Sequence, residues 1–393
     1  MSSQTQARLN DNVINIIAKY FNKSQDYINL TKTCKKYKDI VDNFKYNPIE
    51  DCNGKLFKNV ETYHIYGMYI HYLISKQSIT INKKNKICWC KVKYSSIINK
   101  NENIEYKNVI LDKPILPIPK NITSLDKECF MNNQELTFLN IPDSVVEIGD
   151  KCFFTCTNLK EVNIPNSVTK LGSLCFRKCI NLTKINIPIS VVEIGDDCFS
   201  NCENLKEINI PDSIKKISRE CFCNCYNLTK INIPSSVTKL ESFCFCNCIN
   251  LIKINIPNSV KEFGGRGCFR WCENLKEINI PTSINKISSE CFMQCYNLTK
   301  INIPSSVTEI SYGSFNFCKN LKEINIPLSV KKIGCGCFEA CHKLKTVSIP
   351  MPTAEFDKNC FKWCDELTEI NVKLDETHEI VLKMEEYKQL LKK

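Results

Sequence analysis

Long hydrophobic runs are absent from this sequence. No stretch approaches the roughly 18 consecutive apolar residues that a membrane-spanning helix requires. The N-terminal segment MSSQTQARLNDN is polar and has no apolar run of the kind found in secretory signals. The last residues, LLKK, match neither a prenylation box nor a retention tetrapeptide. We therefore expect a cytoplasmic or nuclear protein without membrane insertion. The alternative is the cell surface, reached by an unconventional route.

Catalytic motifs are absent as well. The chain has four histidines, which stand in unrelated sequence contexts: His64, His71, His342 and His378. It contains no nucleophile elbow, no P-loop and no H-E-x-x-H zinc-protease motif. The sequence therefore predicts a protein that is not an enzyme, with no catalytic residues and no cofactor.

Cysteine, by contrast, is abundant, with 27 residues in a chain of 393. A secreted protein with this content would be held together by disulfides, whereas a cytoplasmic protein keeps its thiols reduced. Because no secretory signal is recognisable, we expect free thiols.

An internal repeat of 23 residues occupies most of the chain. It is marked by regularly spaced prolines, with a single step of 24 between Pro257 and Pro281 and with Lys373 at the last position. The prolines are Pro119, Pro142, Pro165, Pro188, Pro211, Pro234, Pro257, Pro281, Pro304, Pro327 and Pro350. These positions delimit eleven units between residues 119 and 373.

Each unit combines an expected strand with an expected helical turn. The repeated pattern is N-L-x-x-I-x-I-P-x-S-V-x-x-I-G-x-x-C-F-x-x-C. Alternation of Val162 and Ile164 is typical of a strand with one buried face. Residues 174–179 fit one or two helical turns, with Cys175, Phe176 and Cys179 facing inward at i, i+1 and i+4. Since a single unit cannot bury its own apolar face, the units should stack into a solenoid with capped ends.

The unit resembles the BspA-like, Treponema-type leucine-rich repeat, whose pattern is close to L-x-x-I-x-I-P-x-S-V-x-x-I-G-x-x-A-F-x-x-C. The match covers residues 119–373 and departs in one column, where cysteine replaces the usual alanine. The resemblance implies a leucine-rich repeat solenoid. Members of this family are known as binding and adhesion proteins, many of them at cell surfaces. The fold follows strongly from this resemblance, and the partner hardly at all.

The predicted fold is α/β, a leucine-rich repeat solenoid of eleven units of about 23 residues, with parallel strands and short helical turns. Residues 1–50 are expected to be helical, and residues 51–118 to form a β-rich, degenerate cap before the solenoid of residues 119–373. A capping helix is expected over residues 374–393. Its apolar residues recur at helical spacing: Ile380, Met384, Tyr387 and Leu391.

Most of the cysteines fall in two columns of the repeat, which begin at Cys129 and Cys156 and flank the phenylalanine column. Paired cysteines can ligate zinc, but a zinc site closes its tetrahedron with further ligands. Because these columns coincide with core positions, where a free cysteine packs as a small hydrophobe, we expect core packing and no metal. Cys223, Cys246 and Cys335 lie outside both columns and are expected to be more exposed.

The outward strand positions carry asparagine and alternating charge. Asparagine stands between the two buried residues in nearly every unit, from Asn140 to Asn371. Two residues earlier, acidic and basic residues alternate, with one break at Lys230 and Lys253. Stacked amides can hydrogen-bond along such a solenoid, and opposite charges on adjacent strands attract. We therefore expect an amide ladder beside a self-neutralising charged row.

The unit over residues 263–271 is irregular, with one inserted residue, three glycines, two arginines and a tryptophan. Tryptophan and arginine are common in binding hot spots. Trp271 falls in a column that is polar in most other units, so it should be exposed, and two further aromatic residues share its column. We predict a partner-binding patch there: Arg266, Arg270, Trp271, Phe317 and Trp363. Repeat drift, or packing against the C-terminal helix, is the alternative.

The N-terminal segment resembles an F-box in the order of its apolar residues: Leu9, Ile17, Tyr20, Phe21, Ile28, Leu30, then Cys34-Lys35-Lys36-Tyr37. It departs from that pattern where Asn10 replaces the proline and Ala18 a leucine. The resemblance implies contact with a Skp-type adaptor through five residues: Leu9, Ile14, Ile17, Phe21 and Leu30. An ordinary helical cap on the solenoid fits the same residues.

Three functions compete on these observations. The favoured one is a non-enzymatic recognition or adhesion solenoid for protein partners. The alternative is an F-box-type substrate adaptor of a ubiquitin ligase, with the repeats as substrate receptor, and the third is a metal- or redox-responsive thiol protein. Nucleic acid is not expected, because the basic residues before residue 119 are spread along the segment rather than clustered.

Overall fold

The computed structural model describes residues 62–65, 85–98, 104–350, 355–356, 359–373 and 379–383. The chain falls into two compact units. The first comprises the chain up to Leu111 with residues 121–123, and the second comprises residues 112–120 with the chain from Ser124 onwards. The finer division into caps and repeats stays a prediction.

The first unit contains a parallel sheet of β1 (Thr62–Ile65), β2 (Asn85–Lys93) and β3 (Ile104–Leu111). The register between β2 and β3 shifts between Cys88 and Lys91, which marks a β-bulge. A short 3-10 turn, Tyr94–Ser96, follows β2.

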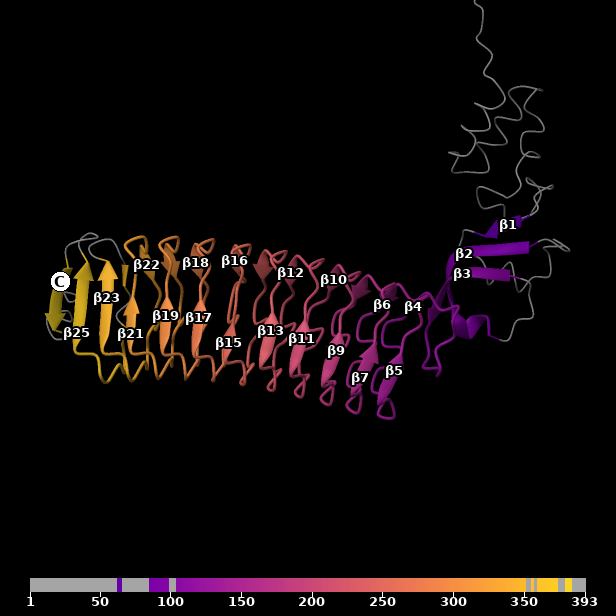
Figure 1. The fold of residues 1–393 in the computed structure, drawn as a ribbon, viewed down its shortest axis with the longest axis horizontal. Coiled ribbons are helices and arrows are strands. Elements are labelled where there is room, and N and C mark those ends of the chain that lie inside the picture. The colour runs from indigo at the N-terminus through magenta and orange to yellow at the C-terminus, as the bar shows by residue number, and fades with distance from the viewer. Residues whose placement is uncertain are drawn as a thin grey trace, which may run out of the picture. The chain divides into compact units, whose positions relative to one another are not determined.

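The second unit is a solenoid whose coils each supply a strand to two rows (Figure 1). The first row is β5 (Phe138–Asn140), β7 (Glu161–Asn163), β9 (Lys184–Asn186), β11 (Glu207–Asn209), β13 (Lys230–Asn232), β15 (Lys253–Ile254), β17 (Glu277–Asn279), β19 (Lys300–Asn302), β21 (Glu323–Asn325), β23 (Thr346–Pro350) and β25 (Glu369–Lys373). The second row is β4 (Ser124–Leu125), β6 (Glu147–Ile148), β8 (Lys170–Leu171), β10 (Glu193–Ile194), β12 (Lys216–Ile217), β14 (Lys239–Leu240), β16 (Glu262–Phe263), β18 (Lys286–Ile287), β20 (Glu309–Ile310), β22 (Lys332–Ile333) and β24 (Glu355–Phe356).

Paired strands within each of these rows run parallel and join equivalent residues of successive coils. Ile208, for example, stands in register with Ile185 of the coil before it and Ile231 of the coil after it. The predicted solenoid of about eleven turns with parallel strands is thereby confirmed.

The alternating sequence explains the first row. The middle residue of these strands is buried while the residues on either side are mostly exposed, as in β7, where Val162 lies between Glu161 and Asn163. Proline then ends most of the strands, because it has no N–H to donate to the ladder. At Gly172, a side chain would meet backbone atoms of the preceding coil at 2.5 Å, so the close approach of the two coils requires glycine there.

The segment after the second row is not helical, contrary to the prediction for residues 174–179. It contains two residues in the left-handed region per coil, such as Leu174 and Lys178 with φ of 58° and 62°. The N–H groups of Leu174, Phe176 and Lys178 donate to carbonyl oxygens of the next coil at 2.8–2.9 Å. Because these N–H groups bond across coils, none is available for a helical bond to a carbonyl four residues back. A pair of tight turns brings residues i and i+4 to the same side, which is why the spacing imitated a helix.

A ladder of stacked phenylalanine rings occupies the centre of the solenoid. Ring centroids of successive coils lie 5.1 to 5.6 Å apart, with interplanar angles of at most 17°. The ladder consists of Phe130, Phe153, Phe176, Phe199, Phe222, Phe245, Phe269, Phe292, Phe315, Phe338 and Phe361. Its repeat is close to the strand spacing of about 4.8 Å, so ring stacking and strand pairing support one another.

The predicted C-terminal helix is wrong in its described part. Residues Glu379–Lys383 form β26, which pairs antiparallel with β25 and sets Ile380 opposite Val372. The edge of β25 has unpaired backbone groups, and a strand satisfies them where a helix would not. The other residues of the predicted apolar stripe, Met384, Tyr387 and Leu391, lie outside the described residues.

The phenylalanine ladder predicts a position-dependent cost of truncation. Phe222→Ala removes a fully buried ring that stacks on two neighbours, so it should lower the free energy of unfolding by about 3–5 kcal/mol. Urea unfolding followed by circular dichroism measures this. The matched control is Phe138→Ala, because Phe138 is 50% exposed and should cost less than about 1 kcal/mol. Equal losses in the two variants would contradict a central role of the ladder.

Candidate binding surface

The cysteine columns belong to the core. Thiols of the second column donate to a phenylalanine carbonyl oxygen of the preceding coil, at 3.0 Å from Cys156 to Phe130 and 3.2 Å from Cys179 to Phe153. Cysteines of both columns are free and buried, apart from the half-buried Cys364. Core packing of the cysteines is thus confirmed. In the described part of the chain, no group of three or more His, Cys, Asp and Glu side chains is placed to hold a metal ion.

Two of the cysteines outside the columns are also buried, contrary to expectation. Cys223 and Cys246 are 9% and 5% exposed, and only Cys335 is half-buried. They occupy the same position in adjacent coils, so each covers the other. The neighbouring Cys246 thiol, together with burial, raises the pKa of Cys223.

Burial also raises the pKa of thiols in the columns, such as Cys129 and Cys156. The pKa of Cys129 rises to about 12 and that of Cys156 to about 11, in both cases mainly by loss of hydration of the thiolate. A folded coil therefore holds the thiol proton over a pH range in which an unfolded chain, with a thiol pKa near 8.5, releases it.

This difference predicts alkaline destabilisation. Each such thiol stabilises the fold fully below about pH 8.5, and its contribution is lost as pH rises towards the folded pKa, by roughly 1 kcal/mol per thiol at pH 9.5. We expect the urea midpoint, measured with a reductant present, to fall steeply between pH 7.5 and pH 9.5. A variant with Cys152, Cys175 and Cys221 changed to alanine should show a shallower fall, because burial raises the pKa of each of these thiols. An unchanged midpoint across that range would refute the argument.

An amide ladder is present, but in a different column from the predicted one. From Asn204 to Asn320, the asparagine that directly precedes the leucine of the repeat donates to its equivalent one coil earlier, for example Asn227 to Asn204 at 3.2 Å and Asn297 to Asn274 at 3.0 Å. In the described coils, no amide-to-amide bond joins two of the exposed strand asparagines predicted from Asn140 to Asn371. The asparagines that precede leucine are half-buried, so their amides need hydrogen-bond partners within the protein. The strand asparagines are exposed and can hydrogen-bond to solvent instead.

Charges of opposite sign pair along the first row, as predicted, and the second row has ion pairs that were not predicted. In the first row, Lys253 and Glu277 form an ion pair at 2.5 Å across adjacent strands. In the second row, Lys170 pairs with Glu193 at 3.3 Å, and similar pairs recur further along the row. Exposed pairs of this kind contribute about 0–1 kcal/mol each. Their main consequence is a strand surface without a large field of one sign.

The two arginines of the irregular coil pair with a carboxylate of the next coil. Arg266 and Arg270 both form ion pairs with Glu290 of the next coil, and the Arg270 contact measures 2.7 Å. Glu290 is only 3% exposed and has a φ of 56°. The sequence analysis missed this carboxylate. Other units hold glycine in the column of Glu290, at Gly267, Gly313 and Gly336. The available signal was an arginine twenty residues before an acidic residue of this column, a spacing that also pairs Arg177 with Asp197.

Trp271 lies beside this ion-pair cluster. The guanidinium of Arg270 stands 4.4 Å from the centre of its ring, so one face of the indole is covered and the residue is half-buried. Its backbone is left-handed, with φ of 60°, in a column where Asn201, Asn224 and Asn247 have the same conformation. Asparagine tolerates that region far better than tryptophan does.

The other two aromatic residues share this column and this strain. Phe317 and Trp363 both have φ of 58°. Trp363 is 54% exposed with the Lys362 ammonium 4.2 Å from its ring centre, and Phe317 is half-buried. Since strands are about 4.8 Å apart, successive members of the row, two coils apart, stand roughly 10 Å from one another. They form a spaced row rather than one cluster.

The structure does not test the F-box-like segment. Leu9, Ile14, Ile17, Phe21 and Leu30 all lie outside the described residues. Within the part of the chain that is described, no helix is long and apolar enough to cross a membrane.

Comparison with protein families identifies the solenoid. The model of the BspA type leucine rich repeat region matches in six copies, over residues 123–251, 192–322 and 238–368. These matches span more than half of the chain, so the chain belongs to the BspA-type leucine-rich repeat family. No curated protein gave a match.

Several solved structures contain similar coils. A leucine rich cell surface protein from Faecalibacterium prausnitzii is 25% identical, with 74% of this chain and 92% of that chain covered and a TM-score of 0.42. A leucine-rich repeat protein from Bacteroides ovatus is 24% identical, with 66% and 86% covered and a TM-score of 0.41. The pneumococcal vaccine antigen PcpA is 20% identical, with 69% of each chain covered and a TM-score of 0.49.

The Glu290 cluster predicts a coil-to-coil clamp. Glu290→Gly removes both ion pairs and keeps a residue that the column accepts elsewhere, so any loss reports the ion pairs and not backbone strain. We expect the free energy of unfolding to fall by on the order of 2 kcal/mol, less than for a fully buried pair because Arg266 is more than half exposed. Urea unfolding of this variant and of Arg270→Ala measures it. A free energy of unfolding equal to that of the unchanged protein would show that these ion pairs do not stabilise the fold.

Proposed function

We propose that the solenoid is a non-enzymatic recognition surface that binds a protein partner through the aromatic row, defined as Trp271, Phe317 and Trp363. The family supports binding in general, and the row supplies a specific place. Large aromatic residues are typical interface anchors because they bury much area with little side-chain entropy.

The observation that carries the proposal is the backbone strain of the row. A left-handed conformation for a bulky residue costs of the order of 1 kcal/mol, and such strain is often found at functional sites. Here it is borne by two tryptophans and a phenylalanine at φ of 58° to 60°, in a column whose other members are Asn132, Thr155, Lys178, Asn201, Asn224, Asn247, Gln294 and Ala340. Folding alone favours asparagine at these places.

Arg266 and Arg270 act in this proposal as supports. Arg270 is held by Glu290 and covers one face of Trp271, which restricts the indole to one orientation. Arg266 is 56% exposed at its side chain and can also reach a partner at the edge of the row.

The row predicts a variant that separates binding from folding. Changing Trp271, Phe317 and Trp363 together to asparagine removes the aromatic surface and relieves the strain, so the urea midpoint should stay equal or rise. Binding of the partner should weaken by about 30-fold or more, which corresponds to the loss of one hot-spot residue at about 2 kcal/mol. Phe138→Glu is the control, because it removes an exposed aromatic residue outside the row.

The partner is identified by purifying the tagged protein and the triple variant from native cells in parallel, followed by mass spectrometry. A partner recovered only with the unchanged protein is then expressed separately, and its dissociation constant is measured against both forms. Equal affinity for the two forms would overturn the assignment to the row. Recovery of extracellular or membrane proteins would favour the cell surface over the cytoplasm.

The alternative function is an F-box-type substrate adaptor of a ubiquitin ligase. It rests on the F-box-like order of residues before Asp51, and it predicts a Skp-type adaptor and a cullin in the same purification. Their loss on changing Ile17 and Phe21 to lysine would establish it, with the aromatic row as the substrate-binding part.

A further inference from the structure

The last strand of the solenoid is paired on one side only. β26 lies beyond β25 at the end of the stack and forms an antiparallel ladder with it (Figure 1). In the part of the chain that is described, no strand pairs with the outer edge of β26. An edge strand of this kind presents a row of unpaired N–H and C=O groups, which is a template for a further strand.

Two apolar side chains of β26 are uncovered. Ile380 is 48% exposed and Val381 is 59% exposed. Ile380 stands opposite Val372 of β25, which is only 5% exposed, and directly opposite residues of an antiparallel pair lie on the same face of the sheet. Ile380 therefore lies on the inner face, where a following coil would bury it, and no following coil exists among the described residues.

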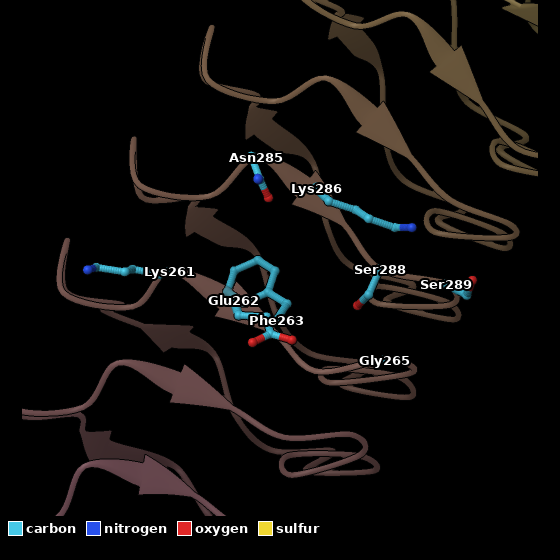
Figure 2. A pocket seen from close by; sticks show the side chains of 8 residues that line it. All are labelled: Lys261, Glu262, Phe263, Gly265, Asn285, Lys286, Ser288 and Ser289. Atoms are coloured by element: carbon cyan, nitrogen blue, oxygen red, sulfur yellow. The ribbon is translucent and has the colours of Figure 1, made fainter.

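The interior of the solenoid offers no comparable edge beside the irregular coil. Strand pairing stops between β16 and β18, where a pocket of about 510 Å³ is lined by residues of both coils (Figure 2). A further strand would need two strand spacings, roughly 9.6 Å, between β16 and β18. Their Cα atoms approach within 8 Å, so a strand can add at the end of the solenoid and not in this gap.

The sequence of β26 is complementary to itself when it is read in the opposite direction. The strand reads EIVLK, with an acidic residue at one end, a basic residue at the other and three aliphatic residues between them. β25 reads EINVK, and its antiparallel register with β26 sets Glu369 opposite Lys383 and Lys373 opposite Glu379. A second β26 can therefore repeat on the outer edge the register that β25 makes on the inner edge.

Two-fold symmetry restricts the register further. Backbone groups of alternate residues face the same edge of a strand, so two identical antiparallel strands bond only when the symmetry axis passes through a residue. An axis at Val381 pairs all five residues and sets Glu379 of each copy opposite Lys383 of the other. An axis one residue to either side would leave two of the five residues unpaired within the strand and would set one charged residue of each copy opposite Val381. Parallel pairing in register would oppose like charges, which is destabilising.

We propose that β26 binds β26 of a second copy of this chain, antiparallel, with the two-fold axis at Val381. The sheet of β21, β23, β25 and β26 then continues into the same sheet of the partner. The interface shares no residue with the aromatic row and does not depend on it. A dimer presents two aromatic rows, so a binding partner with repeated sites gains avidity.

The dimer should be weak. A standard stable interface uses about 20–30 residues on each side, whereas β26 supplies five. Main-chain hydrogen bonds along an added strand still give measurable affinity. We therefore expect a dissociation constant on the order of 100 µM, so that the dimer is populated only at high protein concentration.

Sedimentation velocity on the full chain, from about 5 to about 500 µM, measures this association. We expect the average mass to rise from that of the 45.3 kDa chain towards twice that value. Val381→Lys sets two ammonium groups beside the axis, so it should raise the dissociation constant at least about tenfold. Val381 is exposed and stands opposite Asn371 within the chain, so the fold should tolerate the change. Ile189→Lys is the matched control, because Ile189 is 73% exposed and lies far from β26 in the stack of coils.

Charge reversal tests the register. Two double variants keep opposite charges across β25 and β26 but reverse one end of the outer strand: Lys373→Glu with Glu379→Lys, and Glu369→Lys with Lys383→Glu. Each would oppose like charges in a dimer with itself, so each should stay monomeric. An equimolar mixture should form a heterodimer, because opposite charges face one another again at both ends. Equal urea midpoints of the two variants and the unchanged protein check that both are folded.

Three results would overturn the proposal. One is a monomer at every concentration up to about 500 µM, as when other residues of the chain cover the edge. Another is a dimer that Val381→Lys does not weaken, which would place the interface elsewhere. The third is a mixture of the two double variants that associates no better than either alone, which would exclude the antiparallel register. The triple asparagine variant of the aromatic row should dimerise normally, so failure of either proposal is distinguishable from failure of the other.

Discussion

The hydrogen bond from an N–H group of one coil to a carbonyl oxygen of the next is the interaction on which the rest of the structure depends. It repeats at a nearly constant offset in sequence, so each position of the unit becomes a column in space. Phenylalanine rings stack at 5.1 to 5.6 Å, thiols follow beside them, and charges of opposite sign face one another along the strand rows. A change in one unit is therefore felt mainly by its two neighbours.

The same constraint separates columns that hold the fold from columns that can vary. Inward columns are filled by phenylalanine, cysteine and aliphatic residues. Cysteines of the first column stand where the family pattern has alanine, and thiols of the second column donate to carbonyl oxygens of the preceding coil. The left-handed turn residues point away from the core, and asparagine there costs little. Trp271, Phe317 and Trp363 are less favourable than asparagine in this conformation, which is why we assign the proposed function to the aromatic row.

Strand pairing in the second row is interrupted twice, between β10 and β12 and between β16 and β18. Only the second interruption lies beside the inserted residue of the irregular coil, so an insertion is not required for an interruption. A few residues later, Arg266 and Arg270 reach across to Glu290 and hold the adjoining turns together. These ion pairs join the two coils on either side of the second interruption.

The sequence by itself determined the repeat, the number of coils, the strand row, the burial of the cysteine columns and the charge alternation, because each is a regular pattern that stacking turns directly into a column. It did not determine the turns: inward residues at i and i+4 are shared by a helix and by a pair of left-handed turns, and only the bonds between coils distinguish them. Nor did it locate the amide ladder, the buried Cys223 and Cys246, the Glu290 clamp or the strand at residues 379–383. Those depend on which groups of neighbouring coils come within hydrogen-bonding distance, and that is decided by the tertiary structure.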